Sequence, residues 1–260
     1  MFDAHIHSSM SFDSSVPRED VVAEAVKRGF YGLCFTDYDW EGTRMAQQRA
    51  LACAGGRIIV NNGIELGNAP YGFAAAESVL NAEPEVDFVL GSIHNASEKL
   101  DYKDYYFVDY TDTDICYKYL DDYFIQLEKL VEWGNFDSLA HVPYPLRYMM
   151  QRDGMDVDMA RYQSSIDSML RTLIGRGQAI EINAGKKPYI MPEYAYLLDR
   201  YRALGGRLIT VGTDAHSIPQ FGMGLKKAYM LALEKGFESV AVFKRRKCEL
   251  VSIRKLLALE

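Results

Sequence analysis

Histidine and acidic side chains recur at one kind of position along this chain. The sequence of 260 residues contains five histidines, and each lies at or just past the end of a short apolar or β-branched run. A single histidine at such a position is usually a buried residue with a satisfied hydrogen bond. Packing does not account for the whole set, so the set predicts one functional site. Its members are His5, His7, His94, His141 and His216, together with Asp3, Asp37, Glu65, Glu181, Asn183 and Asp214.

The spacing of the first two histidines indicates what this site binds. In the segment Asp3-Ala4-His5-Ile6-His7, alternate residues of a strand face the same side, so both imidazole rings point to one place. Asp3 either accepts a hydrogen bond from a ligating imidazole or caps the strand. Imidazole and carboxylate ligands without thiolates suit Zn²⁺, Fe²⁺ or Mn²⁺, and argue against a structural zinc site.

The number of candidate ligands exceeds the needs of one metal ion. Two or three ions that share a bridging carboxylate would use the whole set. Closely spaced metal ions typically activate water and stabilise negative charge during phosphoester hydrolysis, which is therefore the chemistry that the set predicts. With Asp13 included, the candidate ligands are His5, His7, His94, His141, His216, Glu65, Asp13 and Asp214.

The segments that carry these ligands follow a repeated pattern of strand and then helix. This alternation predicts an α/β fold with a parallel sheet, either closed into a barrel or open and doubly wound. Both architectures bring the carboxyl ends of the strands to one site. Seven apolar runs predict strands at 2–7, 31–36, 57–65, 86–94, 136–142, 178–183 and 207–213. Helix-period segments lie at 17–28, 44–54, 114–133, 158–176 and 192–204, with two further helices expected after the last run.

Two segments rich in polar residues have more than one interpretation. Residues 101–123 contain seven tyrosines and seven aspartates. They could cover the site and recognise a cationic imidazole or ammonium group, but for most of the segment a solvated loop and an amphipathic helix is the favoured interpretation. The basic residues 244–247 are expected on the polar side of the last helix rather than in a nucleic-acid-binding patch.

The composition is that of a globular protein and excludes several other classes. Hydrophobic residues make up 48% and charged residues 25% of the 29.5 kDa chain, which excludes a disordered or fibrous protein. We expect residues 1–260 to form a single domain. The net charge of −7 argues against nucleic acid or an anionic membrane as the main partner, and no run reaches the roughly 18 apolar residues of a membrane helix. With no signal peptide and no Cys-x-x-Cys pair among its four cysteines, the chain is expected in the reducing cytoplasm.

Seven short motifs, taken in order, resemble those of a known superfamily. They read FDAHIHSSMSFDSS, CFTDYD, NNGIELG, GSIHN, LAHVPY, EINAG and VGTDAHS. As an ordered set they resemble the PHP (polymerase and histidinol phosphatase) superfamily. The segment His5–Ser15 and the stretch GTDAHSIPQFGMG look most like the histidinol-phosphate phosphatases. The resemblance covers about residues 2–250 and implies a distorted (β/α)₇ TIM-like barrel with a metal site at the C-terminal ends of its strands.

The resemblance also implies a ligand for each metal position. This sequence departs from the family pattern at Tyr38, where a histidine usually follows the Thr-Asp of the second motif. A phenol is a poor ligand unless it loses its proton, so a third ion is weakly bound, absent or held through a Tyr38 phenolate. The implied ligands are His5, His7, Glu65 and Asp214 for one ion, Glu65, His94 and His141 for a second, and Asp13 and His216 for a third.

The activity that the resemblance implies is hydrolysis of a small phosphate monoester, with L-histidinol phosphate of histidine biosynthesis as the first candidate. Two or three divalent ions of zinc, manganese or iron would activate the attacking water. Another small phosphomonoester, a nucleotide or phosphotyrosine is the alternative substrate. A metal-binding module that has lost catalysis is the alternative class of protein.

The same resemblance implies which side chains contact the phosphate and the leaving group. Arg147 matches an arginine of the phosphatases, and Lys186 or Lys187 after the EINAG motif is a second candidate for binding phosphate. Either Asp214 or His216 would protonate the departing alkoxide. The residues expected to take part in catalysis are Glu65, Asp214, His216 and Arg147.

Overall fold

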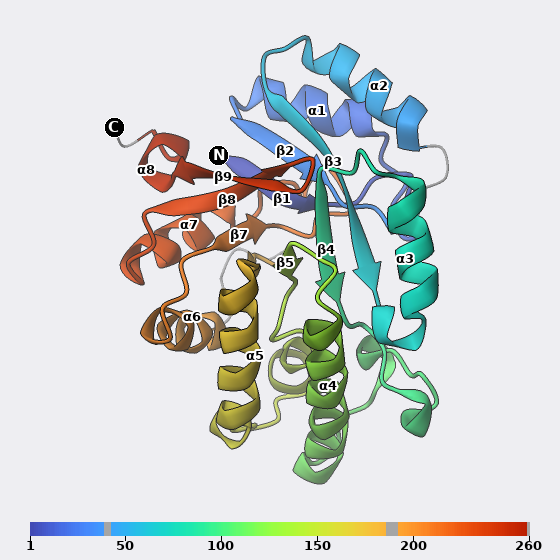
Figure 1. Ribbon diagram of the computed structural model, residues 1–260, viewed down its shortest axis with the longest axis vertical. Helices are drawn as coiled ribbons and strands as arrows, with labels where there is room; N and C mark the ends of the chain where they lie inside the picture. The colour runs from blue at the N-terminus through green and yellow to red at the C-terminus, as the bar shows by residue number, and fades with distance from the viewer. Residues whose placement is uncertain (39–42, 186–191, 259–260) are drawn as a thin grey trace.

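The computed structural model, which describes residues 1–38, 43–185 and 192–258, contains a seven-stranded parallel sheet. The strands follow one another in chain order, and the sheet curves until its first and last strands meet (Figure 1). This is the distorted (β/α)₇ barrel, so the closed alternative is confirmed. The strands are β1 (Phe2–Ile6), β2 (Gly32–Phe35), β3 (Ile59–Gly67), β4 (Phe88–Ser92), β5 (Ser138–Leu139), β6 (Ala179–Asn183) and β7 (Ile209–Gly212).

The barrel closes where the end of β1 meets the chain that leaves β7. The amide of His7 donates to the carbonyl of Ala215 (2.9 Å), and the amide of Asp214 donates to the carbonyl of His5 (2.8 Å). Gly212 permits this approach, because a Cβ atom at residue 212 would lie 2.3 Å from the Cβ atom of His5. Closure therefore sets the two histidines of β1 beside the polar residues that follow β7.

Helices surround the barrel and cover its apolar outer surface (Figure 1). The predicted helices are present, and α3 (Phe73–Ala82) is an addition that the sequence analysis did not name; of its residues, Ala76 and Leu80 are buried. No helix among the described residues is long and apolar enough to cross a membrane. The helices are α1 (Arg18–Lys27), α2 (Thr43–Ala54), α3 (Phe73–Ala82), α4 (Thr113–Trp133), α5 (Gln163–Arg176), α6 (Glu193–Ala203), α7 (Leu225–Glu234) and α8 (Ile253–Leu256).

The expectation that residues 244–247 lie on the last helix is wrong. After α7 the chain forms an antiparallel hairpin of β8 (Ser239–Lys244) and β9 (Lys247–Ser252), and only then the short α8. Arg245 and Arg246 form the turn of the hairpin, with φ values of 49° and 59°. The continuous apolar run 240–243 is a signal of a buried strand, which the helical interpretation overlooked.

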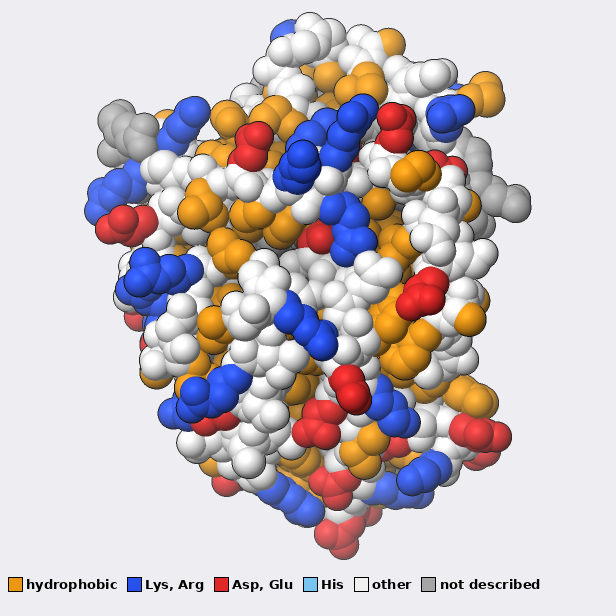
Figure 2. Space-filling model, in the orientation of Figure 1, with side chains coloured by type: hydrophobic (Ala, Val, Ile, Leu, Met, Phe, Trp, Pro, Cys, Tyr) orange, Lys and Arg blue, Asp and Glu red, His pale blue; other side chains and the backbone are white. Residues whose placement is uncertain are grey.

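The hairpin covers the N-terminal end of the barrel, opposite to the candidate ligands. Phe243 stacks on Phe88, with ring centroids 5.1 Å apart. Lys244 Nζ lies 2.8 Å from the carboxylate of Asp87, and Arg246 Nε lies 3.1 Å from that of Asp137. Figure 2 shows Lys and Arg side chains beside acidic ones on this face. The basic turn is therefore paired with carboxylates that precede β4 and β5.

The tyrosine-rich segment 101–123 has two parts with different surroundings. Tyr105, Tyr110 and Tyr123 are buried in the core. Tyr106 and Phe107 form the short helical turn η3 (Tyr105–Phe107) together with Tyr105, and they are exposed at the mouth of a cavity. Within this segment, Asp104, Tyr106 and Phe107 line the cavity and can contact a ligand at the C-terminal end of the barrel.

Candidate metal centre

Glu65 lies at the centre of a compact group of imidazoles at the C-terminal end of the barrel. Its Oε2 atom is 3.1 Å from His5 Nε2 and 3.1 Å from His7 Nε2. Its Oε1 atom is 3.2 Å from His94 Nε2 and 3.0 Å from His141 Nε2. β3 carries Glu65, while the histidines belong to β1 or follow β1, β4 and β5. The two carboxylate oxygens therefore face two different pairs of histidines.

A third group of candidate ligands adjoins the first pair. Asp214 Oδ1 lies 3.6 Å from His7 Nε2 and 3.6 Å from His216 Nδ1, and His216 Nε2 lies 2.7 Å from Asp13 Oδ2. Asp214 has a left-handed backbone conformation (φ 55°), which turns its side chain toward the histidines of β1. The structure thus brings together all eight side chains that the sequence nominates as metal ligands.

Polar side chains behind the ligands orient the imidazole rings. His5 Nδ1 donates to Glu181 Oε1 (2.7 Å), while Glu181 Oε2 accepts the backbone amide of His141 (2.9 Å). His7 Nδ1 donates to the hydroxyl of Ser11 (2.9 Å). A proton on Nδ1 leaves the Nε2 lone pair directed at the centre of the site, as in metal-binding histidines. Sequence reasoning placed Glu181 at a strand end without a role and missed Ser11.

The nitrogen and oxygen atoms of these side chains are arranged to bind divalent cations rather than to form hydrogen bonds with one another. The Nε2 atoms of His5 and His7 are 3.1 Å apart, and those of His94 and His141 are 3.2 Å apart. With the tautomer described for His5 and His7, lone pairs of nitrogen and carboxylate oxygen face each other, and a shared cation relieves that repulsion. Burial lowers the pKa of His7 and His141, which favours the neutral ring that binds metals. At His5 and His94 burial acts in the same direction, but the carboxylates of Glu181 and Glu65 at His5, and of Glu65 at His94, outweigh it and raise the pKa.

Asp3 takes no part in this group of ligands. Its carboxylate accepts the amide of Thr213 (2.9 Å) and the hydroxyl of the same residue (2.6 Å), so it ties β1 to the end of β7. Burial raises the pKa of Asp3 to about 6, against hydrogen bonds from Thr213 that lower it. These contacts support the interpretation of Asp3 as a residue that secures the strand. They do not support the interpretation in which it accepts a hydrogen bond from a ligating imidazole.

Asp37 is likewise an anchor rather than a candidate ligand. Its carboxylate forms an ion pair with the buried Arg18 (2.7 Å) and accepts hydrogen bonds from the hydroxyls of Ser8 (2.7 Å) and Ser11 (2.9 Å). These bonds hold the loop that follows β1 and carries Asp13. Sequence reasoning missed Arg18, because an arginine in a first helical turn ordinarily faces solvent.

Tyr38 occupies the position where the family pattern has a histidine. Its ring lies 4.5 Å from the ring of His7, measured between centroids, and 5.6 Å from that of His94. Burial and the nearby carboxylates of Glu65 and Asp214 raise the pKa of the phenol above its usual value. The phenol therefore keeps its proton in these surroundings and offers a weaker donor than an imidazole.

Arg147 is the basic side chain that faces the metal centre among the described residues that line the cavity. One guanidinium nitrogen lies 3.7 Å from Asp214 Oδ2, and another donates to Asn183 Oδ1 (3.3 Å). Gly185 leaves room for it, because a Cβ atom there would lie 3.3 Å from the guanidinium. The other two candidates for binding phosphate, Lys186 and Lys187, lie outside the described residues.

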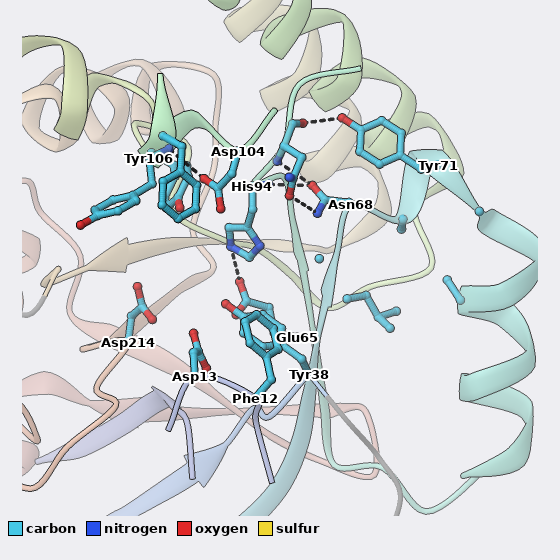
Figure 3. Close-up of a pocket in the computed structure, with 18 of the residues that line it drawn as sticks. Phe12, Asp13, Tyr38, Glu65, Asn68, Tyr71, His94, Asp104, Tyr106 and Asp214 are labelled. Atoms are coloured by element: carbon cyan, nitrogen blue, oxygen red, sulfur yellow. Dashed lines mark hydrogen bonds and ion pairs between the residues drawn. The ribbon is translucent and has the colours of Figure 1, made fainter. Parts of the chain in front are cut away.

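A cavity of about 1000 Å³ opens above the ligands and gives a substrate access to them (Figure 3). Tyr38, Glu65, His94 and Asp214 belong to the polar part of its lining. Small and apolar residues at the end of β3 and on α3 form another part, and an aromatic rim forms the rest. The site combines candidate metal ligands, one arginine and room for an organic group.

Comparisons with known proteins show which family the chain belongs to. The PHP domain family matches residues 3–185 of the chain. A probable histidinol-phosphatase of Thermotoga maritima is 25% identical over 256 residues, which cover 93% of this chain and 95% of the relative. The histidinol-phosphatase of Lactococcus lactis is 27% identical over 265 residues, which cover 95% of this chain and 96% of the relative.

Solved structures give the same result. The crystal structure of histidinol phosphate phosphatase from Lactococcus lactis, complexed with zinc, L-histidinol and phosphate, matches with a TM-score of 0.79 and 26% identity over 95% of this chain and 98% of that chain. A structure of the putative histidinol phosphatase from Listeria monocytogenes shares the fold, with a TM-score of 0.74 at 13% identity, and covers 87% of this chain and 99% of that one. Because the family match spans more than half of its residues, the chain belongs to the PHP domain family.

Proposed function

We propose that this phosphoric monoester hydrolase converts L-histidinol phosphate to L-histidinol and inorganic phosphate, a step of histidine biosynthesis. The observation that carries the proposal is the division of the Glu65 carboxylate between two pairs of histidines at the floor of an open cavity. Relatives of the same length that are named histidinol-phosphatases support the substrate. So does the zinc, L-histidinol and phosphate complex of the similar Lactococcus lactis protein.

The proposed metal ligands are the eight side chains of the candidate centre. Two or three bound divalent ions of zinc, manganese or iron would supply an activated water and neutralise charge on the phosphoryl oxygens. We assign His5, His7, Glu65 and Asp214 to one position, Glu65, His94 and His141 to a second, and Asp13 and His216 to a third.

The chain itself binds and orients the ester. The Arg147 guanidinium is 12% exposed and faces the cavity, where it can donate two hydrogen bonds to one phosphate group. Its contact with Asp214 holds the guanidinium beside the metal ligands before the substrate arrives. We assign the transfer of a proton to the departing alkoxide to Asp214 or His216, which both line the cavity.

The test is the rate of phosphate release from L-histidinol phosphate beside a panel of other phosphomonoesters. The protein is loaded with Mn²⁺, Zn²⁺ or Fe²⁺, and bound metal is counted on the same sample. We expect kcat/KM above about 10⁴ M⁻¹s⁻¹ for L-histidinol phosphate and much lower values for the panel. Selective turnover of a nucleotide, phosphotyrosine or another ester would assign a different substrate, and bound metal without turnover of any ester would contradict the proposal.

Replacing Tyr38 with histidine is expected to increase the number of bound metal ions by about one per chain. The imidazole supplies a neutral donor beside His7, where the phenol must first lose a proton. Elemental analysis after dialysis measures the change. Tyr71→His is the matched control, because Tyr71 lines the same cavity but donates to the carbonyl of Asn95. Equal metal counts in Tyr38→His and the unmodified protein would mean that the third position is complete without residue 38.

A further inference from the structure

The cavity has a polar wall that the metal ligands and Arg147 do not account for. This wall comes from the tyrosine- and aspartate-rich segment, at residues Asp104, Tyr106 and Phe107. Tyr144 and Tyr148 continue it on the side of the turn that follows β5. In Figure 3, Asp104 and Tyr106 lie across the cavity from Asp13, on the far side of His94. A ligand whose phosphate sits at the metal centre can extend its organic group toward this wall.

The backbone holds Asp104 in a fixed place beside the metal centre. Residues 103–105 run antiparallel to the chain that follows β4, with a bridge between Asn95 and Asp104. The amide of Tyr105 donates to the carbonyl of His94 (3.1 Å), and the buried Tyr105 ring anchors the turn in the core. Asp104 therefore lies opposite Asn95, which is next to the candidate ligand His94. The Cα atoms of two residues paired in this way are about 5 Å apart.

The Asp104 carboxylate forms no ion pair with a Lys or Arg side chain among the described residues, although His94 lies near enough to interact with it electrostatically. One oxygen accepts the amide of Tyr106 (2.8 Å), and no Lys or Arg of the described chain forms an ion pair with it. Arg152 packs near the Tyr106 ring, but its charge is paired with Asp153 (2.6 Å), and it is not part of the cavity lining. Partial burial raises the pKa of Asp104, while the hydrogen bond from the Tyr106 amide and the nearby His94 ring lower it.

Aromatic faces complete the surroundings of this carboxylate. The rings of Tyr106 and Tyr148 meet edge to face with centroids 5.4 Å apart, and Tyr148 meets Tyr144 in the same way at 5.2 Å. Aromatic faces and a nearby carboxylate are the usual surroundings of a bound organic cation. A planar ring also gains contact area against such rings.

We propose that Asp104, with the rings of Tyr106 and Tyr148, forms a subsite for a positively charged group on the alcohol part of the substrate. This inference rests on the proposed function and adds a specificity-determining residue to it. The subsite selects phosphate monoesters whose alcohol carries an ammonium or imidazolium group. It disfavours esters with an extra anionic group, because that group would face the negative charge of the Asp104 carboxylate.

The experiment compares four phosphate esters with the metal-loaded protein and its Asp104→Asn variant. L-histidinol phosphate and phosphoethanolamine carry cationic alcohols, p-nitrophenyl phosphate carries a neutral one, and 3-phosphoglycerate carries an anionic one. Asparagine keeps the oxygen that accepts the Tyr106 amide and removes only the charge. We expect kcat/KM to fall by about 10- to 100-fold for the two cationic esters, mainly through KM. The neutral ester should change by less than about twofold, and the anionic ester should improve.

Asp101→Asn is the matched control. It removes the same charge from the same loop, but Asp101 is exposed and is not among the residues that line the cavity. We expect all four esters to keep their rates in this variant. Calorimetric binding of L-histidinol gives a second readout. We expect its Kd to rise in Asp104→Asn by the factor by which kcat/KM falls, and to stay unchanged in Asp101→Asn.

The outcomes separate this inference from the proposed function. Preference for L-histidinol phosphate that survives Asp104→Asn unchanged overturns the subsite and leaves the proposed function standing. An equal loss on all four esters also overturns it, since Asp104 would then only support the fold. Preference for phosphoethanolamine that depends on Asp104 supports the subsite and overturns the proposed substrate. No turnover of any ester, with no change in L-histidinol binding, overturns both.

Discussion

Replacing Glu65 with glutamine is expected to release bound metal ions and to lower kcat/KM by more than about 10³-fold. Loss of a residue that only orients a ligand already costs 10- to 100-fold, and Glu65 contacts both pairs of histidines directly. Glutamine fills the same volume but replaces one carboxylate oxygen by an NH₂ group, which points a donor at the metal position. The measurement is metal content per chain together with kcat/KM for the best substrate.

A matched control separates the role of this carboxylate from a loss of general negative charge. Glu98→Gln removes a charge from the exposed turn η2 (Glu98–Leu100) and should leave the metal content and kcat/KM unchanged. Thermal unfolding followed by circular dichroism shows whether Glu65→Gln keeps the fold. A folded Glu65→Gln protein that retains its full metal content and rate would refute the assignment of Glu65 as the shared ligand.

Arg18→Met is expected to lower the free energy of unfolding by about 3–5 kcal/mol. Arg18 is 1% exposed and Asp37 is 0% exposed, and their ion pair has an N–O distance of 2.7 Å. Methionine keeps part of the buried volume but leaves the Asp37 carboxylate in the interior without its cation. Urea denaturation of the metal-free protein measures the change without a contribution from metal binding.

The surface pair of Arg49 and Glu19 provides the comparison. Arg49 is 55% exposed and lies 3.0 Å from Glu19, so Arg49→Met should cost no more than about 1 kcal/mol. Adding Asp37→Asn to Arg18→Met should recover part of the lost stability, because it removes the unpaired charge. If Arg18→Met is as stable as Arg49→Met, the buried charge of Asp37 is compensated by its serine partners alone.

Most of the barrel can be predicted from the sequence because its signals are local. The run at 178–183 becomes β6 (Ala179–Asn183), and the run at 31–36 becomes β2 (Gly32–Phe35). The run at 136–142 is the exception, since β5 has only two residues (Ser138–Leu139) before the chain turns inward to place His141. Apolar runs mark buried parallel strands, but the residue at which each strand ends depends on its neighbours in the sheet.

The hairpin could not be predicted in the same way. The apolar run 240–243 is a local strand signal, yet the charged turn after it resembles the polar face of a helix until Asp87 and Asp137 are placed beneath it. The segment 101–123 is similar, because composition cannot separate the buried Tyr105 from the neighbouring Asp104 that faces the cavity. In both cases the partners come from distant parts of the chain.

The sequence by itself determined the fold class and the chemical types of the candidate ligands, because strand periodicity and side-chain chemistry are properties of short segments. Only the tertiary structure decided how the ligands divide around Glu65, which histidine Glu181 orients, and where the charge of Asp104 lies. These arrangements depend on barrel closure, in which Asp3 meets Thr213 across 210 residues of chain. Contacts at that separation arise from the packing of the whole barrel, and no local pattern in the sequence encodes their geometry.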